Sequence, residues 1–265
     1  MENIDLIKNI EKKYEFKIDT NKNIRKEYFY RLKKKYYKII GKEKKFLGSN
    51  TIFNNLDKEE LDVIKILLKI DNMSSIAVGF IINQIAKKLS TNDIYLNIGI
   101  YRGFSLLAGM LNTKCKVYGI DNFSHDYHTG DKLLKAKDDL NENLKSKKYF
   151  LSYFDKYKTV DKHKFFEIDY KKFFSNFKEY INFYYYDADH SYENQLENLI
   201  IANQFLKKNS IILVDDYNEE PVERATLDFI SKNSNKFKIL KEFKTANRFI
   251  HPTYANGIIL FEKHS

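Results

Sequence analysis

The stretch from Ile94 to Ser105, IYLNIGIYRGFS, constrains the fold of this chain more than any other segment. Apolar residues at alternate positions predict a strand, which breaks at Gly99 and Gly103, and an apolar run from Ser105 predicts a helix. A strand, a glycine turn and a helix N-terminus can together bind a polar cofactor, because the backbone approaches the ligand closely and free N–H groups point at it. The G-x-x-x-G spacing differs from dinucleotide and P-loop motifs, and it also arises by chance or in helix packing.

Strands and helices are predicted to alternate from residue 93 onward. The predicted strands are Ile94–Ile98, Lys116–Ile120, Lys164–Ile168, Phe183–Tyr186, Ile211–Val214, Ile239–Phe243 and Gly257–Phe261. The predicted helices are Ser75–Leu89, Ser105–Leu111, Asp131–Leu144, Tyr170–Phe177, Glu193–Leu206 and Pro221–Ile230. This order predicts the α/β class, with a mostly parallel seven-stranded sheet covered on both faces. The lack of a helix between the last two strands predicts an antiparallel pair at one edge.

Positive charge is concentrated near the N-terminus. Residues 8–46 hold 15 Lys and Arg against 5 Asp and Glu, and the whole chain carries +10, so the remainder is formally neutral. Residues 24–40 have apolar positions at helical spacing and predict a basic amphipathic helix. Such a helix could meet an anionic partner, or it could be a lysine-rich helix that only faces solvent. We predict a basic helical extension over residues 1–74, usable as a dimerisation surface or a lid, and a main domain over residues 75–265.

Cysteine content and hydropathy indicate a reducing, aqueous compartment. The only cysteine, Cys115, excludes an internal disulfide and is expected to be a buried thiol at the start of a strand. No apolar run reaches the roughly 18 residues that a membrane span needs. The N-terminus also lacks the basic-then-apolar order of a signal peptide. We therefore expect a soluble, cytoplasmic protein.

Acidic residues follow several of the predicted strands. They are Asp121, Asp169, Asp187, Asp189, Asp215 and Asp216. One such residue is commonly a turn or helix cap, but several at one sheet edge would repel each other unless a cation or donors lie among them. An acid after the second strand suits a ribose diol. Asp oxygens suit a hard cation such as Mg²⁺, and His190 titrates near neutrality and could take a proton.

Three motifs, LNIGIYRGFS, VYGID and the pair DADHSYE…LVDDY, resemble those of class I S-adenosylmethionine-dependent methyltransferases. The last pair is similar to the subgroup that includes the macrolide-sugar O-methyltransferases. The resemblance covers roughly residues 75–263. It implies the Rossmann-like methyltransferase fold, S-adenosylmethionine as cofactor and a divalent metal, Mg²⁺.

The resemblance also implies roles for individual residues. The methionine end of the cofactor would be bound by Asn97, Gly99, Tyr101, Gly103 and Ser105. Asp121 would bind the ribose, and Asp169 would lie beside the adenine. The metal would be bound by Asp187, Asp215 and Asp216, and His190 would be the general base. One departure concerns Asn97, where the family has Glu or Asp. A neutral amide cannot make the charge-assisted contact to the cofactor's ammonium that a carboxylate makes.

We expect a metal-assisted O-methyltransferase acting on a hydroxyl of a sugar or glycosylated metabolite. One alternative is a binding module of this fold that has lost catalysis, which Asn97 favours. Another is a nucleic-acid methyltransferase or binder that uses the helix at 24–40. It is less favoured, because the basic surplus lies outside the main domain and the only prolines, Pro221 and Pro252, form no N/D-P-P-Y motif. A homo-oligomer is compatible with the sequence, and no membrane span is expected.

Overall fold

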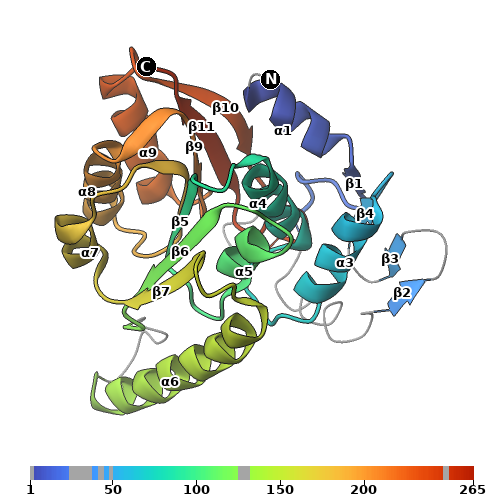
Figure 1. Ribbon diagram of the computed structural model, residues 1–265, viewed down its shortest axis with the longest axis horizontal. Helices are drawn as coiled ribbons and strands as arrows, with labels where there is room; N and C mark the ends of the chain where they lie inside the picture. Colours follow the sequence, from blue (N-terminus) through green and yellow to red (C-terminus); the bar gives the residue numbers. More distant parts are fainter. Residues whose placement is uncertain (1–2, 24–37, 41–44, 48–49, 125–131, 247–250) are drawn as a thin grey trace.

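The computed structural model describes residues 3–23, 38–40, 45–47, 50–124, 132–246 and 251–265. Its centre is a seven-stranded sheet with the order β10-β11-β9-β8-β5-β6-β7 (Figure 1). The strands are β5 (Ile94–Ile98), β6 (Lys116–Asp121), β7 (His163–Glu167), β8 (Ile181–Tyr186), β9 (Leu206–Val214), β10 (Phe237–Phe243) and β11 (Ile258–Lys263). β5 to β9 are mutually parallel, whereas β11 runs antiparallel to both β9 and β10. The predicted fold class, including the antiparallel edge, is confirmed.

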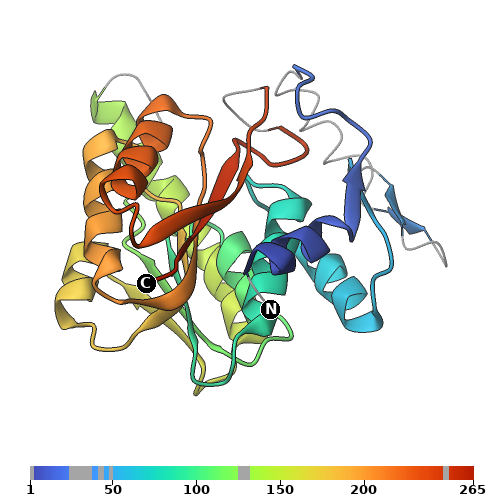
Figure 2. The same ribbon diagram turned by 90° about the horizontal axis from the view of Figure 1, so that it is seen from above.

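Helices cover both faces of this sheet, because alternate strand residues point to opposite sides. On β5, Tyr95 packs with the core under one set of helices and Leu96 with the core under the other. The first set comprises α4 (Ile76–Lys88), α5 (Phe104–Met110) and α6 (Lys132–Tyr157). The second comprises α7 (Tyr170–Asn176), α8 (Tyr192–Asn203) and α9 (Glu220–Lys232) (Figure 2).

Helix α6 is longer than predicted, since it ends at Tyr157 rather than Leu144. The lysines at 145, 147 and 148 lie within the helix and do not mark its end, and Ser146 between them is buried. Phe150 and Phe154 follow them on the buried side and pack against Phe165 of β7. His125 and His128, which follow the second predicted strand in the sequence, lie outside the described residues.

The N-terminal region is not wholly helical, in contrast to the helical extension predicted over residues 1–74. It contains α1 (Asn3–Glu11), α3 (Lys58–Leu67) and four short strands, β1 (Tyr14–Phe16), β2 (Lys38–Ile40), β3 (Lys45–Leu47) and β4 (Thr51–Phe53). β1 pairs with β4, and β2 pairs with β3. Residues 38–40 are therefore a strand where the basic helix was predicted, and most of that predicted helix lies outside the described residues. Asp57 and Glu60 form a capping box at the start of α3.

Tertiary contacts explain these unpredicted strands. Tyr14 of β1 and Phe53 of β4 pack their rings against Phe80 of α4, so pairing β1 with β4 buries both aromatic residues. α4 lies beside α1 and α3 (Figures 1 and 2), and apolar residues of the three helices belong to the same core cluster. The boundary at residues 74 and 75 stays a prediction. No helix in the described part of the chain is both long and apolar enough to cross a membrane.

Candidate active site

The glycine turn after β5 lies directly against the end of β8. Gly99 has a φ of 84°, in the region that favours glycine, and its N–H donates to the carbonyl of Ile120 at 3.0 Å. A Cβ at this position would lie 1.7 Å from the carbonyl oxygen of Asp187. The backbone N–H of Asp187 in turn donates to the carbonyl of Ile98 at 3.0 Å. Glycine is therefore required here because two backbone segments meet.

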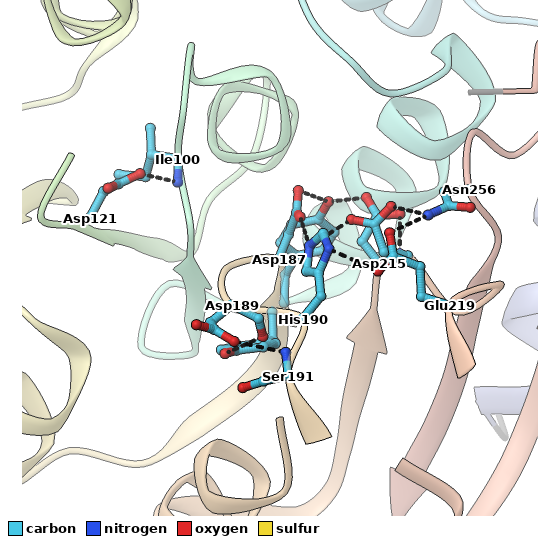
Figure 3. A network of polar contacts seen from close by, with 12 residues as sticks. Ile100, Asp121, Asp187, Asp189, His190, Ser191, Asp215, Glu219 and Asn256 are labelled. Atoms are coloured by element: carbon cyan, nitrogen blue, oxygen red, sulfur yellow. Dashed lines mark hydrogen bonds and ion pairs between the residues drawn. The ribbon is translucent and has the colours of Figure 1, made fainter. Parts of the chain in front are cut away.

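Asp121, at the end of β6, holds this turn in place (Figure 3). Its Oδ2 accepts the backbone N–H groups of Ile100 at 2.7 Å and Tyr101 at 3.0 Å. Its Oδ1 accepts the N–H of Phe123 at 2.6 Å. A carboxylate has about four lone-pair sites, so these three bonds leave room for one further donor. The ribose role of Asp121 stays a prediction, and the structure adds a role in shaping the turn.

Asn97 is fully buried at the end of β5. Its Nδ2 donates to the Oγ of Ser105 at 3.1 Å and to the hydroxyl of Tyr95 at 3.3 Å. Its Oδ1 is buried and has no hydrogen-bond partner within the described structure. A buried acceptor without a partner is costly, so this oxygen is available to a donor that the chain itself does not supply.

The remaining predicted cofactor residues have clear local positions. Tyr101 has a left-handed φ of 51°, and Gly103, with a φ of 92°, immediately precedes α5. Asp169 is the N-cap of α7 and accepts the N–H groups of Lys171 and Lys172 at 2.9 and 3.4 Å. Capping accounts for this aspartate locally, and its place beside adenine stays a prediction.

A cluster of acidic residues and His190 lies at the carboxyl ends of β8 and β9 (Figure 3). The Nε2 of His190 is 2.9 Å from Oδ2 of Asp216 and 3.7 Å from Oδ1 of Asp187. One oxygen from each of these aspartates and one imidazole nitrogen lie within 4.8 Å of each other. Two carboxylates and an imidazole at this spacing can bind a divalent cation.

Asp215 is turned toward the protein interior and is only 6% exposed. Its Oδ2 accepts a short hydrogen bond from the hydroxyl of Tyr185, and its Oδ1 accepts the N–H of Asp216 at 2.9 Å. The same Tyr185 oxygen lies 3.3 Å from Oδ2 of Asp187. The Tyr185 hydroxyl therefore lies between the two carboxylates. It has one proton and can donate it to only one of them at a time. The predicted metal role of Asp215 stays a prediction.

Burial and neighbouring charges alter the proton affinities of the cluster. Burial raises the pKa of Asp187, and burial together with the neighbouring aspartates raises that of Asp215 well above its usual value. Burial opposes the charged forms of Asp216 and His190, but their mutual contact outweighs it, so the pKa of Asp216 is lowered and that of His190 is raised. Asp187 and Glu219 also raise the pKa of His190. The carboxylates around His190 thus favour the protonated form of its imidazole.

Sequence reasoning missed two residues of the cluster, Glu219 and Asn256. Oε2 of Glu219 lies 3.4 Å from Nδ1 of His190. Nδ2 of Asn256 donates to Oδ1 of Asp216 at 2.8 Å and to Oε1 of Glu219 at 3.0 Å. Glu219 stands at a helix start, where acidic residues are common for another reason. Asn256 lies in the β10–β11 connection and belongs to no recognisable motif.

Comparisons with known proteins agree with this architecture. Residues 96–217, which span all the predicted site residues, match the family model described as a methyltransferase domain. No curated protein matches the chain in sequence. The methyltransferase PaMTH1 of Podospora anserina, solved with S-adenosylhomocysteine (SAH) bound, has 14% identity and a TM-score of 0.51. The similarity covers 79% of this chain and 89% of that chain.

A second solved structure, provisionally assigned as an rRNA methylase from Clostridium thermocellum, has 14% identity and a TM-score of 0.50. The similarity covers 71% of this chain and 96% of that chain. At this level of identity the likeness concerns the fold. The chain therefore has the Rossmann-like methyltransferase fold, and residues 96–217 have the sequence features of a methyltransferase domain.

Proposed function

We propose that this protein is an S-adenosylmethionine-dependent O-methyltransferase that acts, with a divalent metal ion, on a hydroxyl of a sugar or glycosylated metabolite. One observation carries the proposal. Gly99 of the glycine turn lies in backbone contact with Asp187, the first residue of the cluster that also contains His190 and Asp216. A cofactor at the turn and an acceptor at the cluster would then be neighbours, as methyl transfer requires.

The residues at the end of β5 suit the methionine part of the cofactor. S-adenosylmethionine, when bound, supplies a methyl group on a sulfonium leaving group. The unpartnered Oδ1 of Asn97 can accept a hydrogen bond from the cofactor's ammonium. This contact is weaker than one from a carboxylate, but it would satisfy a buried acceptor. PaMTH1, which shares the fold, was solved with SAH bound.

The donor set of the cluster suits a divalent cation. Asp187 and Asp216 offer two carboxylate oxygens, Asp215 lies beside them, and the imidazole of His190 lies at the edge of this set. Mg²⁺ is the cation that the sequence motifs imply, and oxygen ligands favour it. A bound cation would lower the pKa of an acceptor hydroxyl and stabilise the alkoxide.

His190 is the residue that we assign to proton removal. Its Nε2 lies 2.9 Å from Oδ2 of Asp216, so a proton can be shared between these two groups. Its lone pair can therefore accept the proton of an acceptor hydroxyl only after this shared proton has left. Asp187 and Asp216 would orient the imidazole and keep Nε2 directed at the same point as their own oxygens.

The sugar acceptor is inferred from the motif pair DADHSYE and LVDDY and from the polarity of the site. The partly exposed groups of the cluster are carboxylates and an imidazole, with a buried amide behind them. Such groups can bind the neighbouring hydroxyls of a sugar by hydrogen bonds, whereas an apolar acceptor would leave them unpaired.

The test is transfer of a radiolabelled methyl group from S-adenosylmethionine to a panel of sugars, nucleotide sugars and glycosides. We expect Asp187→Asn and His190→Ala to abolish transfer. Asp189→Asn is the matched control, because Asp189 belongs to the same loop but accepts the N–H of Ser191 instead. Equal turnover in all three variants would refute the mechanism. Transfer to RNA and to no hydroxylated metabolite would refute the acceptor class.

A further inference from the structure

A closed ring of polar contacts joins four residues from three separate segments (Figure 3). Asp216 contacts His190 through Oδ2 and Asn256 through Oδ1. Glu219 contacts His190 through Oε2 and Asn256 through Oε1. Both ring nitrogens of His190 and both oxygens of each carboxylate are therefore engaged, with distances between 2.8 and 3.4 Å. Contacts at both ring nitrogens therefore fix the orientation of the imidazole.

The helix dipole favours an acidic residue at the position of Glu219, but helix capping does not explain the direction of its side chain. Glu219 is the N-cap of α9, where Ser, Thr, Asp and Asn are preferred because their short side chains bond to the first free N–H groups. Glu219 makes no such capping bond. Its carboxylate extends instead to His190 and Asn256. The helix therefore forgoes a side-chain cap at this residue, and the carboxylate serves the cluster.

Asn256 shows the same preference for the cluster. Its amide is 95% buried, both its donor contacts go to carboxylates, and its Oδ1 has no hydrogen-bond partner in the described part of the chain. Reversing the amide would place that oxygen against two carboxylates, which is repulsive. The backbone fixes the residue as well, because Asn218 donates its N–H to the carbonyl of Asn256 at 2.8 Å.

We propose that Glu219 and Asn256 are positioning residues that hold Asp216 in the geometry for a divalent cation and His190 in the geometry for proton removal. Asn256, itself held by Glu219, engages Oδ1 of Asp216, so Oδ2 is the oxygen left for the cation. Glu219 also engages Nδ1 of His190, so Nε2 is the nitrogen left for the proton. Partners behind metal ligands orient them in this way, and their loss typically weakens metal affinity about 10–100-fold. This inference rests on the metal of the proposed function.

The experiment is calorimetric titration of Mn²⁺, which takes the carboxylate oxygens that also suit Mg²⁺, into the full chain. We expect Asn256→Ala and Glu219→Ser each to weaken binding about 10–100-fold. Glu220→Gln is the matched control, because the neighbouring Glu220 pairs with Arg224 and not with the cluster. Its affinity should equal that of the wild type.

The Glu219→Ser variant separates positioning from stability. Serine is a preferred N-cap, so this variant should melt at the wild-type temperature or above while its Mn²⁺ affinity falls. If Glu219→Ser lost melting temperature and Mn²⁺ affinity together, the residue would be merely structural and the proposal would be overturned. Unchanged Mn²⁺ affinity in Asn256→Ala, or no Mn²⁺ binding by the wild type, would also overturn it. SAH titrated into the same samples tests the proposed function separately, since SAH binding without Mn²⁺ binding overturns only the positioning proposal.

Discussion

Replacement of Gly99 by alanine tests whether the glycine turn and the acidic cluster form one site. The alanine would have to adopt a φ near 84°, a left-handed conformation that costs about 1–2 kcal/mol for a residue with a Cβ. Its Cβ would also stand 1.7 Å from the carbonyl oxygen of Asp187. Since that atom belongs to the backbone, β5 and β8 must separate, and such overpacking typically costs about 1–3 kcal/mol.

Together these costs predict that Gly99→Ala lowers the free energy of unfolding by about 2–5 kcal/mol, out of the roughly 5–15 kcal/mol of a typical domain. Urea unfolding followed by circular dichroism measures this directly. Because the clash displaces Asp187, binding of both SAH and Mn²⁺ should be lost in the fraction that remains folded.

Gly103→Ala is the informative control. Its φ of 92° carries the same conformational cost, but its Cβ would meet the Phe150 ring at 2.6 Å and no backbone atom. A second change, Phe150→Leu, should therefore recover part of the stability of Gly103→Ala, because a smaller side chain leaves room. No side-chain change can do so for Gly99→Ala. Unfolding of Gly99→Ala at the wild-type urea concentration would refute the reasoning.

Three further predictions concern buried polar groups. Tyr185→Phe removes the hydroxyl that donates to Asp215, and it should lower the free energy of unfolding at pH 7 by about 1–3 kcal/mol in urea titrations. Burial lowers the pKa of His163 from 6.5 to about 4. The unfolded chain therefore binds more protons in this interval, and stability should fall as the pH drops from 6.5 toward 4, by up to about 3 kcal/mol. His163→Gln should remove that part of the pH dependence, and identical pH profiles for the two proteins would contradict the assignment. Asp121→Ala leaves three backbone N–H groups without their acceptor, so SAH affinity measured by calorimetry should fall at least about tenfold, whereas wild-type affinity would exclude a role in shaping the turn.

The fold was largely predictable because strand and helix patterns in the main domain follow local rules. The buried parallel strand at Ile94–Ile98 and the glycines after it are visible as an apolar segment and its interruption. The β1–β4 pair was not predictable in this way. Tyr14 and Phe53 gain their stability from rings on α4, and such contacts leave no periodic pattern in a three-residue strand.

The site was predictable only where its residues follow strands in recognisable order. Asp187, His190 and Asp216 end consecutive parallel strands, so the topology places them together. Asn256 reaches the cluster from the β10–β11 connection, 40 residues beyond Asp216, and its role depends on how that connection folds back. Asp121 was assigned to the cofactor alone, but its carboxylate also binds the turn, because backbone N–H groups carry no sequence signal.

The central claim is that one cofactor site is formed by the glycine turn of β5 and lies beside the acidic cluster. Calorimetric titration of SAH into the full chain tests it most directly. We expect saturable binding of one SAH per chain below about 1 mM, lost in Gly99→Ala and retained in Glu220→Gln. Absence of saturable binding by the wild-type chain at about 1 mM SAH would contradict the methyltransferase function itself.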